Sequence, residues 1–128
     1  MRVLLDTHAL LWLGLTPTRL PRSAYDAIRD DANERFVSAA SAWEVATKTR
    51  LGKLTPGPLA TDFITDVRRQ GFRVLPIGAQ DAQDAGNLPG LHGDPFDRML
   101  IAQALRRGLV LVSNEALFDA YGVTRLWA

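Results

Sequence analysis

Short apolar segments alternate with longer amphipathic segments along the whole chain, and the two kinds differ in period. The apolar segments resemble buried strands, while the amphipathic ones repeat their apolar residues at helical spacing. Strands that alternate with helices are typical of a parallel sheet covered on both faces, so we expect an α/β fold in a single domain spanning residues 1–128. The pattern predicts strands at residues 3–5, 35–38, 72–77, 109–112 and 123–127. It predicts helices at residues 7–14, 21–31, 39–51, 59–70, 79–85, 95–107 and 115–120, a turn at 16–18 and a loop at 86–93.

The segment DPFDRMLIAQA opens the helix predicted at residues 95–107, and its first turn contains two carboxylates. Asp94 is a good N-cap and Pro95 suits the first helical position, so capping explains Asp94 fully. Asp97 either completes the cap, where the helix dipole favours an acid, or holds a metal ion. The side of this helix expected to face a core carries Phe96, Met99, Leu100 and Gln103.

Four acids that are distant in sequence are predicted to meet at one edge of the sheet. Asp6 ends the first strand, Glu44 lies early in the helix after the second, Asp97 begins the helix before the fourth, and Glu115 follows the fourth. Strand carboxyl ends and helix amino ends share one edge in right-handed parallel crossovers, and ligands bind along that edge. Most of the remaining acids are expected to face solvent: Asp26, Asp30, Asp31, Glu34, Asp62, Asp66, Asp81 and Asp84.

Carboxylates that converge in a partly dry cleft repel one another, and a divalent cation removes that repulsion. Mg²⁺ and Mn²⁺ prefer oxygen ligands, so the acids indicate a metal-dependent phosphodiesterase. For Glu44 a capping box with Ser41 or an ion pair with Lys48 remains an alternative. Lys48, Arg50 and Arg98 are candidates for binding RNA phosphates because they share helices with Glu44 and Asp97. Structural roles are expected for His8, His92 and the tryptophans Trp12, Trp43 and Trp127, and solvated helix ends for Arg68, Arg69, Arg106 and Arg107.

Composition narrows the possible functions further. The chain has 128 residues, of which 47% are hydrophobic and 23% charged, with a net charge of +1. A nucleic-acid partner must therefore be held by a local patch rather than by overall charge. The absence of cysteine excludes thiol catalysis, zinc–thiolate sites and disulfides. With no recognisable targeting segment or membrane-length apolar run, we expect a cytoplasmic protein.

Several segments, taken together and in order, resemble the PIN-domain ribonucleases, in particular the VapC-type toxins of type II toxin–antitoxin systems. These segments are LLDTHALLW, VSAASAWEVATKTRLGKL, DPFDRMLIAQA and LVLVSNEALFDAYGV, and they cover nearly the whole chain. The resemblance implies a three-layer α/β/α sandwich with a parallel sheet of four to five short strands. It also implies Mg²⁺- or Mn²⁺-dependent cleavage of RNA such as tRNA, a VapB-type antitoxin partner and a homodimer.

Carried over by position, the resemblance makes Asp6, Glu44 and Asp97 the catalytic and metal-binding acids, and Thr7 and Ser113 supporting hydroxyl residues. In the implied mechanism Asp6 and Asp97 bind the ion, and Glu44 completes its shell or orients the attacking water. The chain departs from the family pattern at the fourth acid, where an Asp is usual. Glu115 stands there as a further metal ligand, and Asp119 lies one turn later.

Two other kinds of protein gather acids at the strand ends of a parallel sheet. A receiver domain needs a partner lysine after a later strand, and a haloacid dehalogenase-type phosphatase needs a second Asp at position 8, which is His. The alternative to a nuclease is a catalytically impaired PIN-like or receiver-like acidic module that acts through protein partners, and Glu115 in place of the usual Asp makes it a real alternative.

Overall fold

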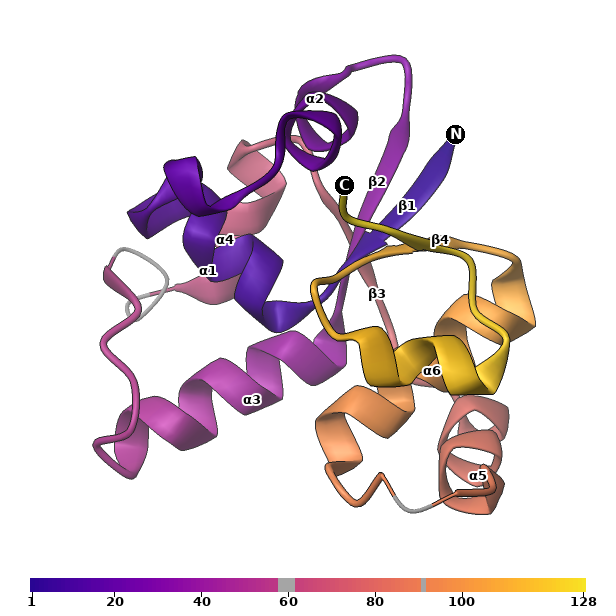
Figure 1. Ribbon diagram of the computed structural model, residues 1–128. Coiled ribbons are helices and arrows are strands. Elements are labelled where there is room, and N and C mark those ends of the chain that lie inside the picture. Colours follow the sequence, from indigo (N-terminus) through magenta and orange to yellow (C-terminus); the bar gives the residue numbers. More distant parts are fainter. Residues whose placement is uncertain (58–61, 91) are drawn as a thin grey trace.

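A parallel sheet lies at the centre of the computed structural model, which describes residues 1–57, 62–90 and 92–128 (Figure 1). Within these residues the sheet has five strands in the order β3-β2-β1-β4-β5, and every neighbouring pair is parallel. The strands are β1 (Arg2–Leu5), β2 (Glu34–Ser38), β3 (Arg73–Leu75), β4 (Val110–Val112) and β5 (Arg125–Leu126). The predicted α/β class and parallel sheet are confirmed.

Helices connect the strands in nearly the predicted positions. They are α1 (Thr7–Leu15), α2 (Arg22–Arg29), α3 (Ala39–Arg50), α4 (Phe63–Arg69), α5 (Ala79–Asn87) and α6 (Pro95–Arg107). Residues Pro17–Arg19 and Ala116–Tyr121 form 3-10 turns, the second where a helix was predicted at 115–120. The start of the helix predicted at 59–70 and position 91 of the predicted loop lie outside the described residues. In the described part of the chain, no helix is long and apolar enough to cross a membrane.

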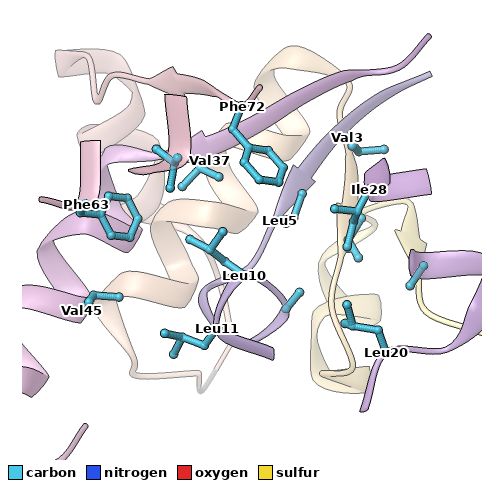
Figure 2. Close-up of a cluster of buried hydrophobic side chains, with 14 residues drawn as sticks. Val3, Leu5, Leu10, Leu11, Leu20, Ile28, Val37, Val45, Phe63 and Phe72 are labelled. Atoms are coloured by element: carbon cyan, nitrogen blue, oxygen red, sulfur yellow. The ribbon is translucent and has the colours of Figure 1, made fainter. Parts of the chain in front are cut away.

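The two faces of the sheet pack against different helices, because alternate residues of a strand point to opposite faces. Val3 and Leu5 of β1 belong to a core cluster with α1, α2 and α4, which Figure 2 shows, while Leu4 between them joins a second cluster with α6. Helix α3 begins directly after β2 and contributes to both clusters, through Val45 and Ala40. The helices therefore cover both faces of the sheet and leave the ends of the strands for a site.

A buried polar network corrects two expectations about surface residues. Asp81, expected to face solvent, is only 1% exposed, and its carboxylate accepts two hydrogen bonds from Arg107 at 2.7 and 3.0 Å. Arg107 is therefore an ion-pair partner rather than a solvated helix end. Gln103, on the predicted core face of α6, accepts a hydrogen bond from Ser38 at 2.6 Å and donates to Pro76 O and Asp81. The sequence pattern missed this network because its members are paired only through the tertiary structure.

The strand order also locates the expected ligand-binding edge. Strands β2 and β3 extend to one side of β1, and β4 and β5 to the other, so the connections change direction between β1 and β4. In open α/β sheets ligands bind outside the carboxyl ends of the strands at such a switch point. Receiver domains have the different order 2-1-3-4-5, so the receiver-like alternative does not fit this topology.

Candidate active site

Asp6 lies at the switch point, directly after β1. Its backbone N–H donates to Val112 O at 3.0 Å, and its carboxylate accepts from the backbone N–H of Ala9 at 2.8 Å, so Asp6 is also the N-cap of α1. Burial raises the pKa of Asp6 despite hydrogen bonds from Ser113 and Ala9, and the nearby charge of Glu44 raises it further. Capping thus uses Oδ1 of Asp6, and the hydrogen bonds do not offset the cost of burying its negative charge.

Glu44 is buried on α3, with only 3% of its surface exposed. The helix begins at Ala39 with Ser38 as N-cap, so Glu44 lies beyond the reach of a capping box, and its Oε2 instead pairs with Lys48. Its Oε1 is buried and has no hydrogen-bond partner among the described residues. One turn before it, Ser41 shares a 2.9 Å hydrogen bond with Thr7, which ties α3 to the start of α1. The free oxygen of Glu44 is the most conspicuous unsatisfied group of the site.

Asp97 lies in the first turn of α6, where Asp94 is the N-cap and accepts from the backbone N–H groups of Phe96 and Asp97 at 2.9 and 3.1 Å. Its Oδ2 lies 2.9 Å from Nε2 of His92. Burial and the charges of Asp94 and Glu44 raise the pKa of Asp97 to about 6, although the His92 hydrogen bond lowers it. Asp94 therefore caps the helix, and Asp97 does not have the capping role that the sequence offered as one alternative. Ionising Asp97 costs free energy in the folded protein.

The structure brings Asp6, Glu44 and Asp97 into one electrostatic group, since the charge of Glu44 acts on both of the other acids. They come from three separate elements, as the edge argument predicted. No three His, Asp or Glu side chains of the described residues are gathered tightly enough to form a complete ion site by themselves. A divalent ion here would therefore depend on a few carboxylates and on water, which is common for Mg²⁺.

The residues predicted for the fourth acid lie differently. Glu115 is half-buried beyond β4, where its backbone N–H donates to Ser113 Oγ at 3.0 Å, and its charge acts on Arg125. Asp119 is bound to Arg125 at 2.8 and 3.0 Å, away from the three acids. Neither contributes to the pKa shifts of Asp6 or Asp97.

Lys48 neutralises part of the acidic cluster. Partial burial alone would lower its pKa, but the hydrogen bond to Glu44 and the charges of Glu44, Asp94 and Asp97 together raise it. Arg50, the other cation predicted on α3, is exposed at the end of that helix. Lys48 thus forms the ion pair with Glu44 that the sequence offered as an alternative, and Arg50 lies one half-turn further on.

The assignment of Arg98 as a phosphate-binding residue does not fit its contacts. Its guanidinium donates to the backbone carbonyls of Ala85, Gly86, Leu88 and His92. Four of its five N–H donors are occupied in this way among the described residues. Arg98 holds the loop between α5 and α6.

Trp43, expected to pack, is instead 58% exposed, with its ring edge-on to Phe96 at 4.8 Å between centroids. Each of these aromatic residues directly precedes an acid of the site, Glu44 or Asp97. Trp12 and Trp127 pack on each other at 5.7 Å, as expected. The tryptophan prediction is therefore correct for this pair and wrong for Trp43.

The parallel sheet with an acidic cluster at its switch point defines the class: an α/β protein with a candidate site for a divalent cation. The model of the PIN domain family matches residues 3–123. The chain belongs to the PIN-domain family, and the resemblance seen in its motifs is confirmed.

Curated relatives agree with this assignment. The chain is 32% identical over 116 residues to ribonuclease VapC22 of Mycobacterium tuberculosis, covering 88% of this chain and 86% of the relative. It is 41% identical over 69 residues to ribonuclease VapC16 of the same organism, covering 48% and 49%.

Solved structures share the fold at low sequence identity. The crystal structure of VapBC2 from Rickettsia felis, bound to a DNA fragment from its promoter, matches with a TM-score of 0.73 and 16% identity over all of both chains. FitAB bound to the IR36 DNA fragment matches with a TM-score of 0.64 and 17% identity, over 98% of this chain and 94% of that one. These likenesses concern the fold.

Proposed function

We propose that the protein is a metal-dependent endoribonuclease and the toxin component of a VapBC-type toxin–antitoxin pair. The relatives named as ribonucleases VapC22 and VapC16 support RNA as the substrate. The observation that carries the chemistry is the electrostatic coupling of Glu44 to both Asp6 and Asp97 at the switch point of the sheet. The fold alone gives no reason for carboxylates from three separate elements to raise one another's pKa, whereas a bound cation would offset their repulsion.

The side chains present fit Mg²⁺ or Mn²⁺. The group offers carboxylate oxygens, the unpartnered Oε1 of Glu44 is one of them, and the acids repel one another without a cation. We assign Asp6 and Asp97 as direct ligands. Glu44 either completes the ligand shell or orients the attacking water, and Glu115 is assigned as an outer contact of the ion. A bound divalent ion would acidify a water molecule and stabilise negative charge on the phosphate that is attacked.

The chain's own groups perform the remaining tasks in the proposed reaction. Oε1 of Glu44 is free to accept a hydrogen bond from the attacking water and orient it toward phosphorus. Lys48 would leave Glu44 to bind a phosphate next to the scissile one, with Arg50 further along α3. Thr7 and Ser113 support the site, since Thr7 fixes α3 through Ser41 and Ser113 lies against Asp6.

Incubating the purified protein with mixed cellular RNA and Mg²⁺ or Mn²⁺ tests the proposal. Cleavage should require the metal and should be lost in Asp6→Asn and in Asp97→Asn, since each removes a charged ligand. Asp26→Asn is the matched control, because Asp26 is an exposed acid on α2 that pairs with Arg22. Cleavage that persists in EDTA or in either site variant would refute the mechanism. Metal binding without cleavage of any RNA would favour the catalytically impaired module.

The same proposal includes the partners. We expect a small VapB-type antitoxin that binds this chain and blocks cleavage, a homodimer in solution, and action in the cytoplasm, where the RNA is. Co-expression with the product of the neighbouring gene, followed by mass measurement of the purified complex, tests the first two expectations. A chain that stays monomeric and copurifies with no small partner would contradict them.

A further inference from the structure

Arg98, in the first turn of α6, binds the end of α5 and residues that follow it. Its guanidinium donates to the carbonyls of Ala85 and Gly86 in α5 and of Leu88 and His92 beyond it, with distances of 3.0 Å to Ala85 and 2.9 Å to His92. Hydrogen bonds from a charged donor are stronger than those between neutral groups, so these contacts tie Leu88 and His92 to the first turn of α6. The position of His92 is therefore set by the residue that directly follows Asp97.

His92 is held on two sides. Its Nε2 lies 2.9 Å from Oδ2 of Asp97, and its ring packs on the buried Phe118, with centroids 5.9 Å apart at 45°. The side chain is only 18% exposed. A hydrogen bond on one side and ring packing on the other thus hold the imidazole beside Asp97.

Asp97 needs such a restraint. The charges of Asp94 and Glu44 both act on it, and the last torsion of an aspartate side chain is soft. An ionised carboxylate released from His92 would turn away from these like charges. Because an ionised carboxylate accepts but cannot donate, Nε2–H is the donor whenever Asp97 is charged.

We propose that His92 is a positioning residue of the site: it binds Oδ2 of Asp97 and so leaves the other oxygen, Oδ1, for a divalent cation. This inference rests on the proposed function in that Asp97 is taken as a ligand. Hydrogen-bonded partners of ligating carboxylates commonly set metal affinity, and losing one typically costs about 10–100-fold in affinity or activity. Arg98 acts one step further back by fixing the loop.

Two substitutions separate positioning from packing. His92→Phe keeps a ring against Phe118 and removes the donor, whereas His92→Gln loses the ring and keeps an N–H that reaches Asp97. Mn²⁺ affinity is measured by calorimetry, RNA cleavage in parallel, and folding by circular dichroism and urea unfolding. We expect His92→Phe to bind Mn²⁺ about 10-fold or more weakly, and His92→Gln to stay within a few-fold of the wild type. If His92→Phe fails to fold, His92→Ala replaces it.

The outcomes distinguish this inference from the proposed function. Wild-type Mn²⁺ affinity in His92→Phe, or an equal loss in His92→Gln, would overturn the positioning role while leaving the nuclease intact. If the wild type cleaves no RNA, but the three proteins bind Mn²⁺ in the expected order of affinity, the positioning role of His92 would be supported and the nuclease refuted. A wild-type protein that binds no Mn²⁺ would overturn both.

Discussion

Replacing Asp97 by Asn should make the metal-free protein more stable at neutral pH, although it removes a residue of the proposed site. Burial of the carboxylate, together with the charges of Asp94 and Glu44, raises its pKa from 3.8 to about 6. An amide keeps the shape and still accepts the hydrogen bond from His92, but it carries no charge. The substitution therefore removes the cost of burying a charge and its repulsion by Asp94 and Glu44.

The size of the effect follows from the pKa of Asp97. A shift from 3.8 to about 6 corresponds to about 3 kcal/mol of lost stability once the folded protein has ionised. The first turn of α6 favours an acid by roughly 0.3–1 kcal/mol through the helix dipole, and the amide loses that gain. The net expectation is about 2 kcal/mol of stabilisation in Asp97→Asn.

The sign depends on pH. Below pH 3.8 the carboxyl is neutral in both the folded and the unfolded chain, so its contribution to stability is fully present there. As pH rises toward 6 the unfolded chain ionises first and the folded chain holds more protons, so wild-type stability falls. Asp97→Asn and wild type should thus be similar near pH 4 and differ by about 2 kcal/mol near pH 8.

Urea unfolding in EDTA at these two pH values measures the difference directly. Asp26→Asn serves as the control, because its exposed carboxylate should contribute little at either pH. Added Mn²⁺ should stabilise the wild type and not Asp97→Asn. An Asp97→Asn protein no more stable than the wild type near pH 8 would refute the view that this acid is held against repulsion.

Three further substitutions test the pairing of the buried polar groups by the same unfolding measurement. Arg107 lowers the pKa of Asp81 to about 2, so Asp81→Asn should lower the free energy of unfolding by about 2 kcal/mol at pH 7. The wild type should lose this stability as pH falls from 3.8 toward 2. An unchanged free energy of unfolding in Asp81→Asn would contradict the ion pair. Gln103→Leu should cost about 1–3 kcal/mol, because it leaves Pro76 O and Ser38 short of partners; a neutral effect would contradict the network. Lys48→Met should destabilise the protein in EDTA and increase the stabilisation by Mn²⁺, and equal Mn²⁺ effects in variant and wild type would contradict its neutralising role.

The fold was largely predictable because its signals are local. Short apolar runs mark the strands, Asp6 ends β1, Gly71 and Pro76 flank β3, and α6 begins and ends where Asp94, Pro95 and Gly108 predict. Strand β3 is shorter than the predicted 72–77, since Pro76 has no N–H to continue the ladder. The strand order was not predictable, because the same alternation of elements fits several parallel sheets.

The acids of the site were predictable from topology, and their partners were not. Asp6, Glu44 and Asp97 each occupy a strand end or an early helix turn, which is enough to assign them to one edge. The contacts of His92 and Arg98 depend on the path of the chain between α5 and α6. The spacing of residues in the sequence shows only that both lie close to Asp97. The exposure of Trp43 likewise follows from how α3 and α6 approach each other.

Asp81 and Asp97 show why burial alone does not identify a functional acid. Both lie in the first turn of a helix, Asp81 is the more deeply buried, and nothing in the sequence separates them. Their electrostatics are opposite: Arg107 brings the pKa of Asp81 down to about 2, while burial and like charges bring that of Asp97 up to about 6. A neutralised acid stabilises the fold, whereas an acid with a raised pKa destabilises the folded protein once it ionises, and we propose that such an acid binds a charge from outside. The sign of the pKa shift, combined with the position of Asp97 in the first turn of α6, is therefore the criterion by which we assign Asp97 to the proposed site and Asp81 to the framework.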